Sequence, residues 1–247
     1  MNTECREKRL EIKRAWRRSD TYKAICLHYQ EEVNRLLSIG LGLLKSVHEV
    51  KDTLLEQVAV FEYGTGAIHR GYYCPSPVID LIVGNLKRGR IVKKAPKAGY
   101  RYAFDAEGNM LFVDLLQQGD VEATEYLFMQ NGNRYGITVN NDGELESICE
   151  EQFAQGELLR YNLATVYPEE DGYFCANLHV ETYWRDAHGL KESTKAEYQP
   201  YIQNLDEYRC IFERANGFLR SYTCSELGMQ EAEDSGLRYV IRMKRKA

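Results

Sequence analysis

Residues 100–143 read YRYAFDAEGNMLFVDLLQQGDVEATEYLFMQNGNRYGITVNNDG, and this stretch decides the fold class. Aromatic and aliphatic residues alternate with polar ones, and the alternation is interrupted at Gly108-Asn109, Asn131-Gly132 and Asp142-Gly143. Asn-Gly and Asp-Gly pairs adopt the positive φ angles that a tight hairpin turn requires. The stretch therefore predicts antiparallel strands joined by short turns.

The same pattern continues toward the C-terminus, with turn residues at Gln155-Gly156, Asp171-Gly172, His188-Gly189 and Asn216-Gly217. We expect chain reversals near Gly108, Gly132, Gly156, Gly189 and Gly217. The pattern predicts one apolar sheet face and one face in water. Ten or eleven strands are predicted, at 99–106, 109–116, 124–130, 134–139, 144–153, 157–167, 173–186, 190–199, 207–214, 218–225 and 237–245.

The N-terminal part has helical spacing instead. Apolar residues recur at steps of three, four and seven over 4–37, and Ser38-Ile-Gly-Leu-Gly42 predicts a break before a second helix over 43–58. A strand over 58–63, a short helix from Ser76 to Gly89 and a basic connector over 87–97 follow. We predict a mainly β, α+β protein in which an N-terminal helical region (1–98) packs on an antiparallel sheet region (99–247) within one integrated domain.

Charge is distributed unevenly along the chain. The net charge is −5, but residues 1–99 carry +7 and residues 100–247 carry −12; 13 of the 18 tyrosines also follow residue 99. An acidic, Tyr-rich sheet suits recognition of a basic partner protein. The predicted contact residues are Glu144, Glu146, Glu150, Glu151, Glu157, Tyr161, Tyr167, Glu169, Glu170, Asp171 and Tyr173.

Several classes of function find little support in the sequence. The longest apolar run, 36–44, is shorter than the roughly 20 residues that span a membrane. The seven cysteines include no CxxC pair, which argues against a zinc or redox motif. We therefore expect a cytoplasmic protein without metal, cofactor, membrane partner or small-molecule substrate.

Two alternatives to protein binding remain open. The first is an enzyme, because strand periodicity places Asn177, His179, Glu181 and Tyr183 on one face, where His and Glu could act as an acid–base pair; His69 and Cys74 form a weaker candidate. The second is a nucleic-acid-binding protein that uses the basic first half of helix 4–37. The acidic sheet opposes a polyanion, so we expect protein binding.

One segment resembles a known repeat. Tyr102-Ala-Phe-Asp-Ala-Glu-Gly-Asn109 is similar to the Tyr-x-Tyr-Asp-x-x-Gly-Asn pattern of Rhs/YD repeats, and residues 126–144 echo it. The layout of N-terminal helices followed by a Tyr-rich hairpin meander resembles the immunity proteins of contact-dependent and other polymorphic bacterial toxins. This resemblance implies a non-enzymatic inhibitor that binds and neutralises a cognate toxin, for instance a basic nuclease.

Overall fold

A computed structural model describes residues 3–66, 90–170, 172–187, 189–215 and 218–226. The predicted fold class is confirmed: helices come first, and antiparallel strands make up most of the rest. The chain forms two compact units, one of residues 35–176 and one of residues 1–34 with 177–247. The sequence-based boundary near residue 98 lies inside the first of these, which we call the central unit; we call the other the terminal unit.

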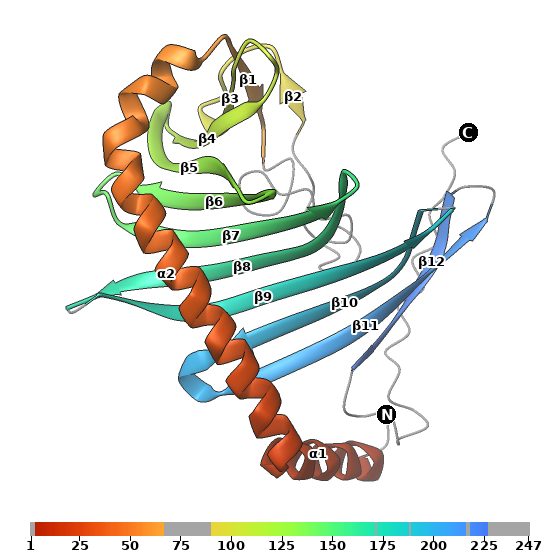
Figure 1. The fold of residues 1–247 in the computed structure, drawn as a ribbon. Helices are drawn as coiled ribbons and strands as arrows, with labels where there is room; N and C mark the ends of the chain where they lie inside the picture. The colour runs from red at the N-terminus through yellow and green to blue at the C-terminus, as the bar shows by residue number, and fades with distance from the viewer. Residues whose placement is uncertain (1–2, 67–89, 171, 188, 216–217, 227–247) are drawn as a thin grey trace. The chain divides into compact units, whose positions relative to one another are not determined.

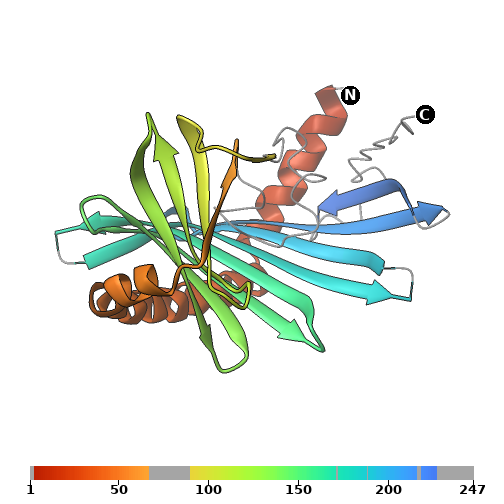
Figure 2. The same cartoon turned by 90° about the horizontal axis from the view of Figure 1, so that it is seen from above.

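In the central unit, β3 to β8 form a meander of hairpins, and β1 and β2 continue the sheet beyond β3 (Figure 1). Its strand order is β8-β7-β6-β5-β4-β3-β1-β2, and each neighbouring pair is antiparallel. Strand direction rotates from the yellow strands near residue 100 to the green strands near residue 150 (Figure 2), as expected of a twisted sheet. The strands are β1 (Val60–Gly64), β2 (Ile91–Val92), β3 (Ala98–Phe104), β4 (Met110–Gln117), β5 (Asp120–Gln130), β6 (Asn133–Asn140), β7 (Leu145–Ala154) and β8 (Glu157–Glu169).

The predicted chain reversals in the central unit occur at glycines that adopt positive φ angles. Gly108, Gly132 and Gly156 all have φ near +80°, and each lies in the turn between two paired strands. Reversals near residues 189 and 217 are confirmed by the strands on either side. Gln118-Gly119 forms one more hairpin turn that the sequence prediction missed, with φ values of 54° and 98°.

The helices differ from the prediction at two places. The break lies at Ser19, between α1 (Thr3–Arg18) and α2 (Asp20–Gln57), and the Ser19 hydroxyl accepts a bond from the Tyr22 N–H. The predicted break at 38–42 is wrong, because α2 continues through both glycines. A Cβ at Gly40 would lie 2.3 Å from Cγ1 of Ile148 on β7, so Gly40 permits close packing of helix on sheet.

Both faces of the central sheet contain buried residues, which corrects the expectation of one solvated face. On the face that packs against α2, Phe112, Ile137 and Ile148 are at most 3% exposed. On the opposite face, Val113 and Cys149 are at most 1% exposed. Polar residues on this sheet are therefore not automatically surface residues.

The terminal unit pairs β9 with β10, β10 with β11 and β11 with β12, all antiparallel. Tyr22, near the start of α2, donates its hydroxyl to the carbonyl of Gln203 and accepts the N–H of Leu205 at 2.8 Å. These bonds tie the helix to the connection before β11. The elements are β9 (Gly172–Asp186, in this unit from residue 177), β10 (Gly189–Gln199), the 3-10 turn Pro200–Ile202, β11 (Asn204–Ala215) and β12 (Phe218–Glu226).

Some predicted features lie outside the described residues: His69, Cys74, the short helix of 76–89, Asp171 and the strand of 237–245. Within the described part of the chain, α2 is the longest helix, and neither helix is apolar enough over a sufficient length to cross a membrane.

Candidate functional site

Five acidic residues lie toward one end of the central sheet, at which the β6–β7 turn and the end of β8 are found. We call them the acidic edge: Glu122, Glu144, Glu146, Glu169 and Glu170. Glu122 and Glu146 are the extra residues of β-bulges, since the register skips each of them. Partial burial and the charges of Glu122 and Glu144 raise the pKa of Glu146. Two like charges therefore lie near Glu146.

Aromatic side chains accompany the acidic edge. Tyr167 and Phe174 stack with ring centroids 5.6 Å apart, and they are 51% and 36% exposed. The Leu145 N–H donates to the Tyr173 hydroxyl at 3.2 Å, which joins β7 to the start of β9, where Phe174 also lies. β8 extends beyond its Ser147–Thr165 pairing, so that Tyr167 and the carboxylates after it reach the same end of the sheet.

The structure divides the predicted contact set. Glu144, Glu146, Tyr167, Glu169, Glu170 and Tyr173 lie together, whereas Glu157 is exposed at the opposite end, in the β7–β8 hairpin. Glu150, Glu151 and Tyr161 are at most 1% exposed, so they cannot contact a partner in this fold. The sequence-based prediction of these three residues as contacts is therefore wrong, because both sheet faces bury side chains here.

Glu150 is the centre of a buried polar network. Arg35 of α2 forms an ion pair with it, and the hydroxyl of Tyr135 donates to Oε1 at 2.8 Å. Asn162 and Gln152 donate to Oε2 at 2.9 and 3.1 Å. Burial alone would raise the pKa of Glu150, but these bonds and the charge of Arg35 outweigh it and lower the pKa. The carboxylate therefore anchors α2 to the sheet.

Glu151 points to the opposite face and behaves differently. Arg134 pairs with it across β6 and β7, yet burial outweighs that charge and raises the pKa of Glu151 to about 7. Its Oε1 is buried and accepts no hydrogen bond from any residue that the structure describes. Both features belong to a side chain held inside the fold, so Glu151 is a structural group with a titration near neutrality.

His179, the centre of the enzyme alternative, is buried at 2% exposure in the terminal unit, which corrects its expected place on a solvated face. Nδ1 lies 2.5 Å from Oε1 of Glu197 and Nε2 lies 2.6 Å from Oε1 of Glu181. Tyr183 donates to Glu181, and Asn177 donates to Glu197 at 2.9 Å. Burial would raise the pKa of Glu197, but His179, Asn177 and Lys195 lower it to about 2.

This arrangement confirms that the four residues share a face, and adds Glu197 and Lys195, which sequence spacing could not identify because β10 brings them across. Both ring nitrogens of His179 are already bonded and the ring is hidden from solvent. Acid–base catalysis requires access to a reacting proton. The network therefore suits a structural role.

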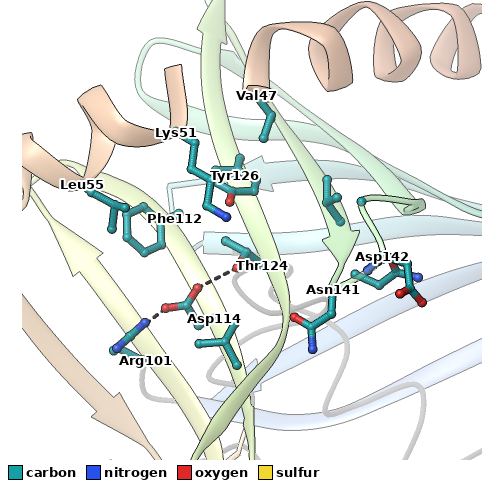
Figure 3. A pocket seen from close by; sticks show the side chains of 14 residues that line it. Val47, Lys51, Leu55, Arg101, Phe112, Asp114, Thr124, Tyr126, Asn141 and Asp142 are labelled. Atoms are coloured by element: carbon teal, nitrogen blue, oxygen red, sulfur yellow. Dashed lines mark hydrogen bonds and ion pairs between the residues drawn. The ribbon is translucent and has the colours of Figure 1, made fainter. Parts of the chain in front are cut away.

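A cavity of about 500 Å³ lies in the central unit between the end of α2 and the sheet (Figure 3). Asp114 forms part of its wall: Oδ2 accepts a bond from Arg101 Nε at 2.7 Å, and Oδ1 accepts the Thr124 hydroxyl at 2.7 Å. Nothing in the sequence pattern predicted it, because its walls come from separate elements. The lining residues are Val47, Lys51, Leu55, Arg101, Phe112, Asp114, Val121, Thr124, Tyr126, Val139, Asn140, Asn141, Asp142 and Gly143.

The cavity adjoins the acidic edge. Asn140 lines the cavity and donates its amide to Glu144 at 3.1 Å, while its own side-chain oxygen accepts the Glu144 N–H at 2.9 Å. Among the described residues, no group of three or more His, Cys, Asp or Glu side chains is arranged to hold a metal ion. The Asn140–Glu144 bonds therefore connect the acidic edge to the wall of the cavity.

The chain matches no protein-family model, and no curated protein matches it significantly.

Proposed function

We propose that this protein is a non-enzymatic protein-binding module that recognises a basic partner through the acidic edge and the Tyr167–Phe174 pair. The proximity of Glu122 and Glu144 to Glu146 carries the proposal, because their negative charges act with partial burial, the larger cause, to raise the pKa of this carboxyl. A cationic surface would relieve that repulsion. The exposed, stacked rings provide the apolar contact that slows dissociation.

The partner that fits best is a cognate toxin, so the protein would act as an immunity protein. This assignment rests on the resemblance of the chain layout to immunity proteins of polymorphic toxins and on charge. A nuclease toxin binds phosphates and is therefore commonly basic, and an acidic inhibitor can occupy the same surface.

The test is co-expression with a toxin encoded beside this gene, followed by measurement of association rates at low and high salt. Because exposed charges are screened beyond about 10 Å at 0.1 M salt, association should slow as salt rises. Changing four acidic-edge residues to lysine should slow association about tenfold or more at low salt while the fold stays intact. The variant is Glu122→Lys, Glu144→Lys, Glu169→Lys and Glu170→Lys.

A matched control changes four other exposed carboxylates by the same total charge: Glu31→Lys, Glu62→Lys, Glu107→Lys and Glu157→Lys. We expect a much smaller effect, since none of these residues belongs to the acidic edge. If both variants slow association equally, the net charge of the protein and not the acidic edge determines the association rate. If association does not respond to salt or to the acidic-edge variant, the proposed surface is wrong; if cells gain no protection, the immunity assignment is wrong.

The nucleic-acid alternative gains no support from the basic helix. Lys13 and Arg17 of α1 both pair with Asp206 of β11, at 2.8 and 3.4 Å. Part of the basic stripe therefore attaches α1 to the terminal sheet, and those side chains contribute less to a phosphate-binding surface.

A further inference from the structure

The cavity beside the acidic edge has the dimensions of a ligand site. Its volume of about 500 Å³ falls within the range of about 300–1,000 Å³ that small-molecule pockets occupy. One wall comes from the last turns of α2, through Val47, Lys51 and Leu55, and the others come from the sheet and the β6–β7 turn. All of these residues belong to the central unit.

The lining combines apolar and polar side chains, and two of the apolar ones are aromatic. Phe112 and Tyr126 are cross-strand partners on β4 and β5, and their ring centroids lie 6.1 Å apart. Aliphatic side chains at Val121 and Val139 add to this surface. A flat aromatic body would gain both area burial and ring contacts here.

The polar groups converge at Asp114. Each of its carboxylate oxygens accepts one bond, from Arg101 or from Thr124, and a carboxylate oxygen has a second lone pair with which to accept another. Asp114 is only 3% exposed, so an added donor would bind in a poorly solvated place. A ligand N–H or O–H therefore suits this wall of the cavity.

The charges that line the cavity cancel. Lys51 and Arg101 are cationic, Asp114 and Asp142 are anionic, and no other ionisable acid or base among the lining residues adds to them apart from the Tyr126 phenol, whose pKa is raised by burial. A ligand with a full charge would lose hydration in a cavity whose lining charges sum to zero. An uncharged ligand avoids that cost.

We propose that this cavity binds a flat, uncharged, aromatic small molecule that carries a hydrogen-bond donor, with the rings against Phe112 and Tyr126 and the donor toward Asp114. The site is independent of the basic partner proposed above, since its chemistry requires neither a cation nor a protein surface.

The probe is N-phenyl-1-naphthylamine, an uncharged fluorescent aromatic amine with one N–H. We expect saturable binding to the full chain, seen as enhanced emission. Val121→Trp, which fills the cavity, should weaken binding about tenfold or more, whereas Leu159→Trp, at an exposed position outside the lining, should leave it unchanged. Binding that survives Val121→Trp would overturn the site.

Two related dyes test the chemical class without altering the protein. The N-methylated dye lacks the donor, and 8-anilino-1-naphthalenesulfonate adds a negative charge to the same rings. Both dyes should bind more weakly than the parent dye. Equal or tighter binding of the N-methylated dye would overturn the donor contact with Asp114. Equal or tighter binding of the sulfonate would overturn the preference for an uncharged ligand.

NMR keeps the proposal falsifiable if Val121→Trp does not fold. With the parent dye and the wild-type chain, amide signals of Thr124, Asn140 and Gly143 should shift while that of Gly156, in the opposite turn, should not. Shifts centred elsewhere would overturn the assignment.

Discussion

Replacing Gly40 and Gly42 separately by alanine tests how α2 packs on the central sheet. Both glycines lie in the same helix, two residues apart. A Cβ at Gly40 would lie 2.3 Å from Cγ1 and 2.8 Å from Cδ1 of Ile148, which is fully buried, whereas a Cβ at Gly42 meets nothing within 4 Å. The two substitutions should therefore change the free energy of unfolding in opposite directions.

The magnitudes follow from two opposing contributions. Alanine is favoured over glycine within a helix by about 1 kcal/mol, and this gain should appear in full for Gly42→Ala. At Gly40 the same gain is opposed by overpacking against Ile148, which costs about 1–3 kcal/mol when side chains cannot move away. We expect Gly40→Ala to be less stable than Gly42→Ala by about 1–3 kcal/mol.

Urea unfolding of each full-length variant, followed by circular dichroism, measures the difference. A third background makes the assignment specific: after Ile148→Ala has removed the obstructing atoms, Gly40→Ala should become neutral or stabilising, so the pair should show a coupling of about 0.5–3 kcal/mol. If Gly40→Ala and Gly42→Ala stabilise equally, helix and sheet do not approach closely at Gly40, and the packing argument fails.

Three further predictions concern the buried polar groups. Folding raises the pKa of Glu151 from 4.5 to about 7, so the contribution of Glu151 to stability is most favourable below pH 4.5, and about 3 kcal/mol of it is lost by pH 7. The stability of Glu151→Gln relative to wild type, measured by urea unfolding at several pH values, should therefore increase over that window. A pH-independent difference would contradict this. Glu150→Ala should lower stability by about 3–5 kcal/mol, because it leaves Arg35 and the other donors without their acceptor. Glu146→Ala, at an exposed position, should change stability by about 0.5 kcal/mol or less. Similar losses of the two variants in thermal unfolding would refute the division of the predicted acidic contact residues into buried and exposed members. His179→Ala should likewise lose about 3–5 kcal/mol, because Glu181 and Glu197 would face each other without the ring between them; a stable variant that had lost only biological activity would favour the enzyme alternative.

Local turn chemistry explains why the strands could be predicted so closely. Gly132 and Gly156 adopt the positive φ values that their neighbouring residues suggest, and the strands between such turns match the predicted ranges within a few residues. Turns of this kind depend on two or three consecutive residues. Such turns can therefore be predicted from the sequence without knowledge of the rest of the fold.

Long-range packing explains what sequence reasoning missed. Gly40 was read as a helix break because glycine destabilises helices, but contact with Ile148, more than 100 residues away, decides its role. Glu150 was assigned to the surface because most carboxylates are exposed, yet Arg35 lies 115 residues away and stabilises it inside. The alternation of apolar and polar residues within one strand carries no information about Ile148 as the partner of Gly40, or about Arg35 as the partner of Glu150.

The candidate site was predicted in part for the same reasons. Glu146, Glu169 and Tyr167 do share one end of the sheet, because turn spacing determined where the strands end. The cavity needed side chains from α2, β4, β5 and β6 together, and no local pattern links residues such as Leu55 and Thr124. Its discovery depended on the tertiary structure.

Chain connectivity has a consequence for synthesis on the ribosome. The central unit is one continuous segment, 35–176, while the terminal unit joins residues 1–34 to residues that follow 176. The central unit can therefore complete its contacts as soon as its own segment has emerged. The first half of α2 must wait, with Tyr22 and Cys26 unprotected, until β11 has been translated. A chaperone that binds nascent chains would find its target in the first half of α2.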